Sequence, residues 1–149
     1  MPRKTDSNNS ADWLFIAESD LAGIRLLIER QVAYALCLSK LAEILEKVLK
    51  AELLRTGWFL EKTHDLLKLG GELRGRGSDL TDRIRPLCET LAEKYFTDRY
   101  PGFDLEDPDW PTLRAQIADI SSLLDVVKQR VHTAPGDRKT STNSQSAIS

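Results

Sequence analysis

Few side chains in this sequence are of a type and spacing that could do chemistry, and the two histidines come first. His64 and His132 each lack a second histidine or a cysteine at metal-ligand spacing. No GxSxG-like turn presents a serine nucleophile. The many carboxylates fall mostly at expected helix-surface positions, so none of them is a clear candidate for a general acid or base. The residues therefore predict no catalytic group, no metal site and no cofactor.

The stretch "YFTDRYPGF", from Tyr95 to Phe103, gathers four aromatic rings around an aspartate, an arginine and a proline. The rings can close one end of a helical bundle, with Arg99 capping helix carbonyls and pairing with Asp98. Alternatively, Arg99 and the rings can stack on a base or hold a phosphate, because guanidinium and aromatic planes suit that contact. The residues favour a structural seal and leave a ligand contact through Arg99 and Tyr100 open.

His64 is open to three interpretations. It follows Thr63, a fair N-cap, and precedes Asp65 at the expected start of a short helix. Its ring could cap neighbouring backbone, pair with Asp65, or face a shared pocket. Taken alone, the histidine favours a structural role.

Composition limits the class of partner and the compartment. The chain has 149 residues, of which 21 are basic and 23 acidic, and its net charge of -2 gives no general attraction to nucleic acid or to an anionic membrane. Cys37 and Cys88 lie in apolar segments without a CxxC pattern, which predicts two buried thiols in a reducing cytoplasm. Neither a signal peptide nor a membrane span is indicated. We therefore expect a soluble cytoplasmic protein without a membrane partner.

The densest apolar segment runs from Gln31 to Thr56 and predicts a core helix that is buried on more than one side. Its expected outer face carries two acid-first pairs at i,i+4 spacing, Glu43 with Lys47 and Glu46 with Lys50. Such pairs stabilise a solvated helix by a few tenths of a kcal/mol each.

Helical spacing recurs in the rest of the chain. A short helix is expected over His64 to Leu69, stopping at Gly70-Gly71, and the following "GGELRGRGSD" is expected to be a flexible connection. Three other long helices are expected. The first covers Ala11 to Glu29, with Ser10 as its N-cap, and the second covers Leu80 to Tyr95, where Pro86 would kink the helix or delay its start. The third covers Leu113 to Val131 and follows Pro111, a proline at a position that suits a helix start.

No segment alternates apolar and polar residues at strand spacing. The sequence therefore predicts an all-α fold, an antiparallel bundle of four long helices plus one short helix. The bundle would occupy residues 11–132, between a disordered N-terminal segment, 1–10, and a disordered polar tail, 133–149.

Four motifs occur in an order and spacing that resemble the HEPN domain, the helical domain named for higher eukaryotes and prokaryotes nucleotide-binding. The motifs are Asp20-Leu21, "EKVLKAELL" from Glu46 to Leu54, "THDLLKL" from Thr63 to Leu69, and "LAEKYFTDRYP" from Leu91 to Pro101. The resemblance spans about Ala11 to Val131. It implies a bundle of about five helices, a homodimer, and pairing with a small nucleotidyltransferase in a bacterial or archaeal two-gene system of the toxin-antitoxin or defence type.

The sequence departs from the ribonucleases of this family. Those enzymes carry an arginine, four to six further residues and then a histidine, and two protomers bring this pair together to promote RNA cleavage. Here residues 57–59 precede His64 at that distance and residues 125–127 precede His132, and neither range contains an arginine. The standard ribonuclease pair is therefore missing, as is a tyrosine after it that partner nucleotidyltransferases modify.

The remaining signatures, "EKxLKA", "HDL" and "RYP", resemble the helical substrate-binding half of aminoglycoside nucleotidyltransferases. The resemblance implies a ligand site at the polar residues that match these signatures. They form either a shared pocket or a buried network that fixes the short helix and the aromatic corner against the core helix. The matching residues are Lys47, Lys50, His64, Asp65, Arg99 and Tyr100.

These observations favour a non-catalytic HEPN binding module that holds a nucleotide or another anionic ligand for a separate nucleotidyltransferase. The alternative is a metal-independent ribonuclease toxin, acting on RNA, in which Arg99 and His64 meet in space as a non-standard pair. A purely structural scaffold is the third hypothesis.

Overall fold

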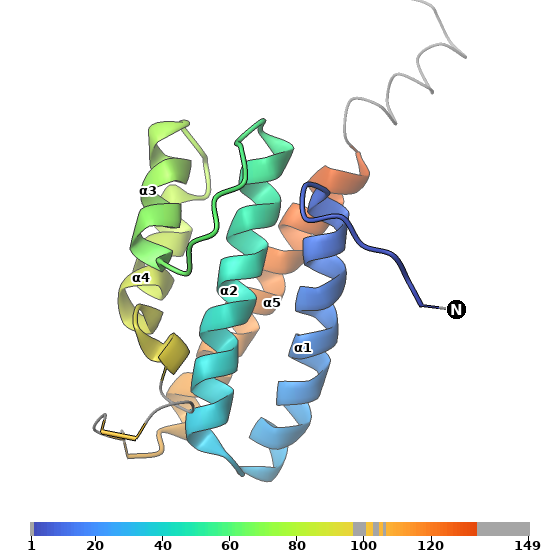
Figure 1. The fold of residues 1–149 in the computed structure, drawn as a ribbon. Helices are drawn as coiled ribbons and strands as arrows, with labels where there is room; N and C mark the ends of the chain where they lie inside the picture. Colours follow the sequence, from blue (N-terminus) through green and yellow to red (C-terminus); the bar gives the residue numbers. More distant parts are fainter. Residues whose placement is uncertain (1, 97–100, 103–104, 106, 134–149) are drawn as a thin grey trace, which may run out of the picture.

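The computed structural model describes residues 2–96, 101–102, 105 and 107–133, and this part of the chain contains helices and turns but no strand (Figure 1). The predicted all-α bundle is confirmed. Three helices have 21 to 23 residues, whereas α3 and α4 have 10 and 11. The elements are α1 (Ser10–Arg30), α2 (Tyr34–Arg55), α3 (Leu66–Gly75), α4 (Thr81–Leu91), the 3-10 helix η1 (Lys94–Phe96) and α5 (Trp110–His132).

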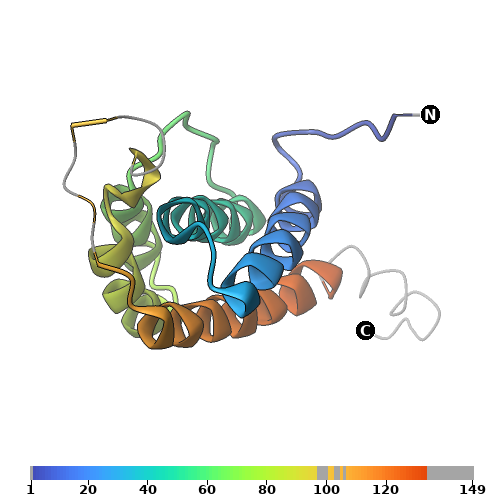
Figure 2. The same cartoon turned by 90° about the horizontal axis from the view of Figure 1, so that it is seen from below.

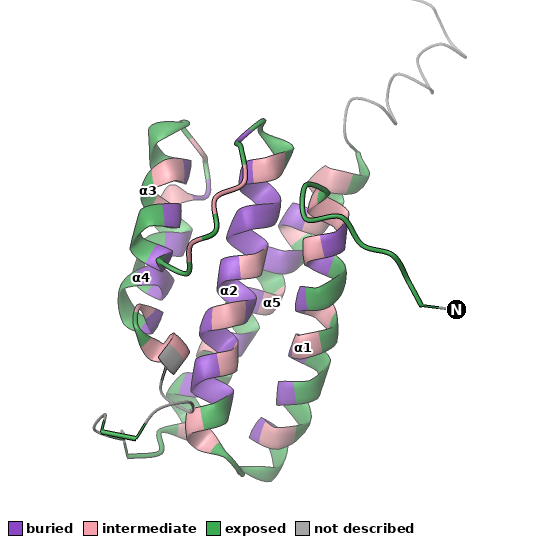
Figure 3. Ribbon diagram, viewed as in Figure 1, coloured by how far each residue is buried: buried purple, intermediate pink, exposed green. Residues whose placement is uncertain are grey.

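Helix α2 lies at the centre of the bundle, with α1, α5 and the α3–α4 pair arranged around it (Figure 2). Fourteen of its 22 residues are buried, and Figure 3 shows buried residues on several of its sides. A helix enclosed in this way needs apolar residues around most of its circumference rather than along one stripe. The predicted burial of this helix on more than one side is therefore confirmed.

The turn between α1 and α2 falls inside the segment that the sequence predicted to be helical. Helix α2 begins at Tyr34 rather than Gln31, because Gln31 and Ala33 adopt left-handed backbone angles, with φ of 54° and 55°. The amides of Gln31 and Val32 bond back to the carbonyls of Ile28 and Leu27, which completes the end of α1. This turn contains neither glycine nor proline, so the spacing of apolar residues gave no sign that residues 31–33 lie outside the helix.

The start of α1 differs from the predicted one by one residue, Ser10 instead of Ala11. Asn9, not Ser10, caps α1, since its Oδ1 accepts a hydrogen bond from the amide of Ala11 at 2.9 Å. The Ser10 hydroxyl instead donates to the carbonyl of Ala51 in α2, at 2.9 Å. At its C-terminal end α2 stops at Arg55, and Gly57 follows with φ of +96° and donates its amide hydrogen to the carbonyl of Leu54.

Helix α3 continues through Gly70-Gly71, where the sequence predicted a stop. A Cβ at Gly70 would lie 3.3 Å from the Sγ of Cys88, so the missing side chain lets α3 and α4 approach closely. Three buried leucines, Leu66, Leu69 and Leu73, hold α3 against the bundle on either side of the glycine pair. Burial of this apolar stripe outweighs the helix-breaking tendency of two glycines.

Helix α4 begins at Thr81, one residue after the predicted Leu80, and ends at Leu91, so the predicted extension to Tyr95 is wrong. Pro86 lies inside this helix, where it removes one backbone hydrogen bond.

Helix α5 begins as predicted around Pro111, with Asp109 as its cap. The predicted tail falls almost entirely on residues outside the described part of the chain. No helix in that part has the length and hydropathy needed to cross a membrane.

Both cysteines are free and buried, as predicted. Burial raises the pKa of the Cys88 thiol to about 12 and also raises the pKa of Cys37. Both thiols therefore stay protonated, and unreactive, at neutral pH.

We expect native protein at pH 8 to react with a disulfide reagent such as DTNB only after unfolding. Because folding raises the pKa of both thiols, their protonated forms contribute fully to the free energy of unfolding below the unfolded pKa of about 8.5. This contribution decreases as the pH rises from about 8.5 toward 12. Absorbance of the released thiolate, with and without urea, measures the reaction. Rapid modification of either cysteine in the folded protein would contradict the assignment.

Candidate functional site

A groove of about 340 Å³ opens along one side of α2, and we refer to it as the α2 groove. Four separate parts of the chain line it: α1, α2, the segment that precedes α3, and η1. Packing of α1 and η1 against α2 brings these parts together. The lining residues are Trp13, Glu43, Glu46, Lys47, Lys50, Lys62, His64 and Tyr95.

The α2 residues of the groove share one helix face because they are three or four positions apart. This face was predicted to be solvated, and that prediction is wrong at its centre. The side chains of Glu46 and Lys50 are only 8% and 4% exposed. Trp13 on one side and His64 on the other contact these two side chains, so the predicted i,i+4 pair forms inside the protein.

The buried pair has several partners, as buried charges require. The Nζ of Lys50 donates to Glu46 at 2.8 Å and lies 5.0 Å from the centre of the Trp13 ring. The second oxygen of Glu46 lies 3.0 Å from the Nδ1 of His64. Since an ammonium group has three N–H donors, Lys50 keeps donor capacity beyond its bond to Glu46.

His64 faces the groove, which is one of the three roles that the sequence left open. Its ring stacks on the ring of Tyr95, with centroids 4.4 Å apart and planes inclined by 18°. The carbonyl of Tyr95 accepts a hydrogen bond from the hydroxyl of Ser39 at 2.9 Å, which ties η1 to α2. With Nδ1 directed at Glu46, and with 56% of its side chain exposed, His64 presents the rest of its ring to solvent and the groove.

Two family motifs meet at the rim of the groove. Lys47 of the "EKVLKAELL" motif pairs with Asp20 of the first motif, across the α1–α2 interface. Leu21, the next residue, is buried in the core. Glu43 accepts a hydrogen bond from Lys40 at 3.3 Å. The Asp20-Leu21 motif thus has a local role, because it docks α1 on α2 beside the site.

The structure brings together three of the six predicted site residues, Lys47, Lys50 and His64. Asp65 does not line the groove; it caps α3 by accepting a hydrogen bond from the amide of Lys68 at 3.1 Å. Arg99 and Tyr100 lie outside the described residues, as do Asp98 and Phe103 of the aromatic corner. The remaining lining residues were not predicted as site residues, although Glu46 and Tyr95 lie inside quoted motifs and Lys62 lies next to "THDLLKL".

The groove combines groups that suit a phosphorylated, ring-containing ligand. Three lysines supply donors for anionic oxygens, and two glutamates can accept hydrogen bonds from hydroxyl or amino groups. The rings of Trp13, His64 and Tyr95 offer planar surfaces for stacking. Within the described part of the chain, no group of three or more histidine, cysteine, aspartate and glutamate side chains could hold a metal ion.

A family model described as the HEPN domain matches residues 10–130. No curated protein and no solved structure matches the chain.

We expect Lys50→Met to destabilise the fold by about 3 kcal/mol, because it leaves the Glu46 carboxylate buried without its ammonium partner. The double variant Glu46→Gln/Lys50→Met removes both charges and should recover much of that loss. Urea denaturation followed by circular dichroism measures both.

Lys47→Met is the matched control. The side chains of its ion pair with Asp20 are 18% and 25% exposed, so the loss should be about 1 kcal/mol or less. Equal losses for Lys47→Met and Lys50→Met would show that burial of the Glu46–Lys50 pair has no special energetic weight.

Proposed function

The chain belongs to the HEPN family, and we propose that it is a non-catalytic binding module of this family that holds a nucleotide or another anionic ligand in the α2 groove. The observation that carries the proposal is the set of three lysines, Lys47, Lys50 and Lys62, beside the stacked rings of His64 and Tyr95. The mechanism is positioning: the module fixes the ligand for chemistry that another protein performs.

The charges of the groove support a phosphorylated ligand with polar groups along its length. Lys62 is exposed, and no carboxylate in the described part of the chain pairs with it, so its ammonium is available to phosphate oxygens. Glu43, which also lines the groove, can accept hydrogen bonds from ribose hydroxyls or from an exocyclic amino group. The buried Glu46–Lys50 pair holds the wall in place before the ligand arrives, which lowers the ordering cost of binding.

The proposal includes the setting that the family resemblance implies. The module would act as a homodimer with a small nucleotidyltransferase, in a two-gene system of the toxin-antitoxin or defence type. The nucleotidyltransferase would supply the catalytic groups.

A metal-independent ribonuclease is the second candidate, and one contact favours it. The Nδ1 of His64 lies 3.0 Å from a buried carboxylate, an arrangement that orients an imidazole for proton transfer. The arginine that this candidate requires, Arg99, lies outside the described residues.

We expect ATP or GTP to bind the purified protein, and Lys62→Gln to weaken that binding by about tenfold, since a charge-assisted hydrogen bond is lost. Arg114→Gln on α5 changes the charge equally away from the groove and should bind like the unmodified protein. Isothermal titration calorimetry measures both. Absence of heat with ATP, GTP and an aminoglycoside would favour the scaffold hypothesis instead.

We also expect tRNA and total RNA to stay intact during incubation with the protein, with or without EDTA, because the standard arginine–histidine spacing is missing. Gel electrophoresis of the RNA measures this. Cleavage that His64→Ala abolishes would overturn the non-catalytic proposal and establish the ribonuclease.

A further inference from the structure

A second cavity, of about 140 Å³, lies in a cleft between α3 and α4, and we propose that this cleft binds a phosphate group. It shares no lining residue with the α2 groove. Its walls include Gly70, Gly71 and Arg74 of α3, and Arg85 and Cys88 of α4. The proposal goes beyond the function assigned above, because it concerns a different surface and stands if the α2 groove binds nothing.

The glycine pair creates the space. Gly70 lies against Cys88 and lets the two helices approach, whereas a Cβ built on Gly71 would meet no atom within 4 Å. Two adjacent glycines on the same helix therefore leave exposed backbone where side chains would otherwise fill the cleft. This accounts for a feature that secondary structure alone does not explain, a Gly-Gly pair in a helix interior.

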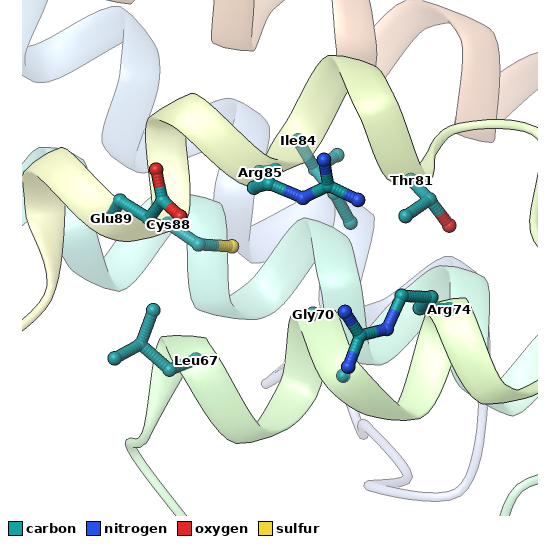
Figure 4. A pocket seen from close by; sticks show the side chains of 9 residues that line it. Leu67, Gly70, Arg74, Thr81, Ile84, Arg85, Cys88 and Glu89 are labelled. Atoms are coloured by element: carbon teal, nitrogen blue, oxygen red, sulfur yellow. The ribbon is translucent and has the colours of Figure 1, made fainter.

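Two guanidinium groups reach into the same space from facing helices. Figure 4 shows Arg74 extending from α3 and Arg85 from α4 over the opening between them. No carboxylate in the described part of the chain pairs with Arg74. Arg85 has one partner, Asp82, at 3.7 Å, and these side chains are 50% and 96% exposed, so the pair is weak. Two like charges lie together here with donor groups free for an anion.

The charge arrangement favours phosphate over a carboxylate. A phosphate monoester carries a charge of about -1.5 to -2 near pH 7, which matches two arginines, whereas one carboxylate would leave a surplus positive charge. Arginine also forms paired hydrogen bonds with phosphate oxygens. Figure 4 shows Glu89 of α4 and Leu67 of α3 on opposite sides of the other end of the cleft, where a second acidic group would be repelled by Glu89. The ligand is therefore anionic at one end and uncharged at the other, as a terminal phosphate monoester would be.

Three probes distinguish the source of the phosphate: inorganic phosphate, AMP, and a short single-stranded oligouridylate with a 5′-phosphate and a 3′-fluorescein label. Binding is measured by calorimetry for the first two and by fluorescence anisotropy for the oligonucleotide. We expect at least one probe to bind, and Arg74→Gln/Arg85→Gln to weaken it by about tenfold or more. Binding of the oligonucleotide alone would identify nucleic acid as the source, whereas binding of all three would identify the phosphate group itself.

Matched variants separate a built site from general attraction. Arg76→Gln/Arg114→Gln removes the same charge outside the cleft and should bind like the unmodified protein. Gly71→Leu keeps every charge but fills the cleft, and it should weaken binding to a similar extent as the double arginine variant. The new side chain starts in open space within a helix, so the fold should be retained, which thermal unfolding checks.

Lys62→Gln in the α2 groove is the control that separates the two proposals: it should leave the binding that depends on Arg74 and Arg85 unchanged, even where it removes nucleotide binding that belongs to the groove. The cleft proposal is overturned by no binding of any probe, by equal weakening in both double variants, or by unchanged binding in Gly71→Leu. Retained binding in the arginine variant with loss in Lys62→Gln would assign the phosphate to the α2 groove.

Discussion

The buried carboxylate of Glu46 joins three parts of the molecule. It bonds to Lys50 one turn further along α2 and to His64 in the segment before α3, and His64 in turn stacks on Tyr95 of η1. A carboxylate removed from water is stable only while such partners remain. This requirement fixes the position of the chain between α2 and α3, and with it one wall of the α2 groove.

A second buried carboxylate on α2 has a comparable role toward the opposite side of the bundle. Glu52, with a side chain that is 2% exposed, bonds to Arg55 and to Arg130 of α5. Arg130 also donates two hydrogen bonds to Asp79, in the connection before α4, and this contact lowers the pKa of Asp79. Six residues turn a helix by about 240°, so Glu46 and Glu52 face different neighbours. The central helix thus binds its surroundings through charges as well as through its apolar residues.

The two proposed sites use different chemistry on a shared scaffold. The α2 groove has mixed charge and aromatic walls, and most of its polar groups already have partners within the protein. The α3–α4 cleft is smaller, and its arginines lack strong partners in the described part of the chain. His64 precedes Leu66, the first residue of α3, by two positions, so one short segment connects the groove to the helix that carries the cleft. Together, the two proposals would place anionic ligands on two separate surfaces of the fold.

The sequence by itself determined that the chain is an all-α bundle, because helical periodicity is a property of neighbouring residues. Family motifs also indicated three groove residues. Only tertiary structure decided that the Glu46–Lys50 pair is buried, since the same i,i+4 spacing fits a solvated face. Likewise, Gly70 interrupts a helix by local preference, yet contact with Cys88 retains it inside α3. Local patterns specify which face a helix could bury, whereas the partner that covers that face comes from residues far away in the sequence.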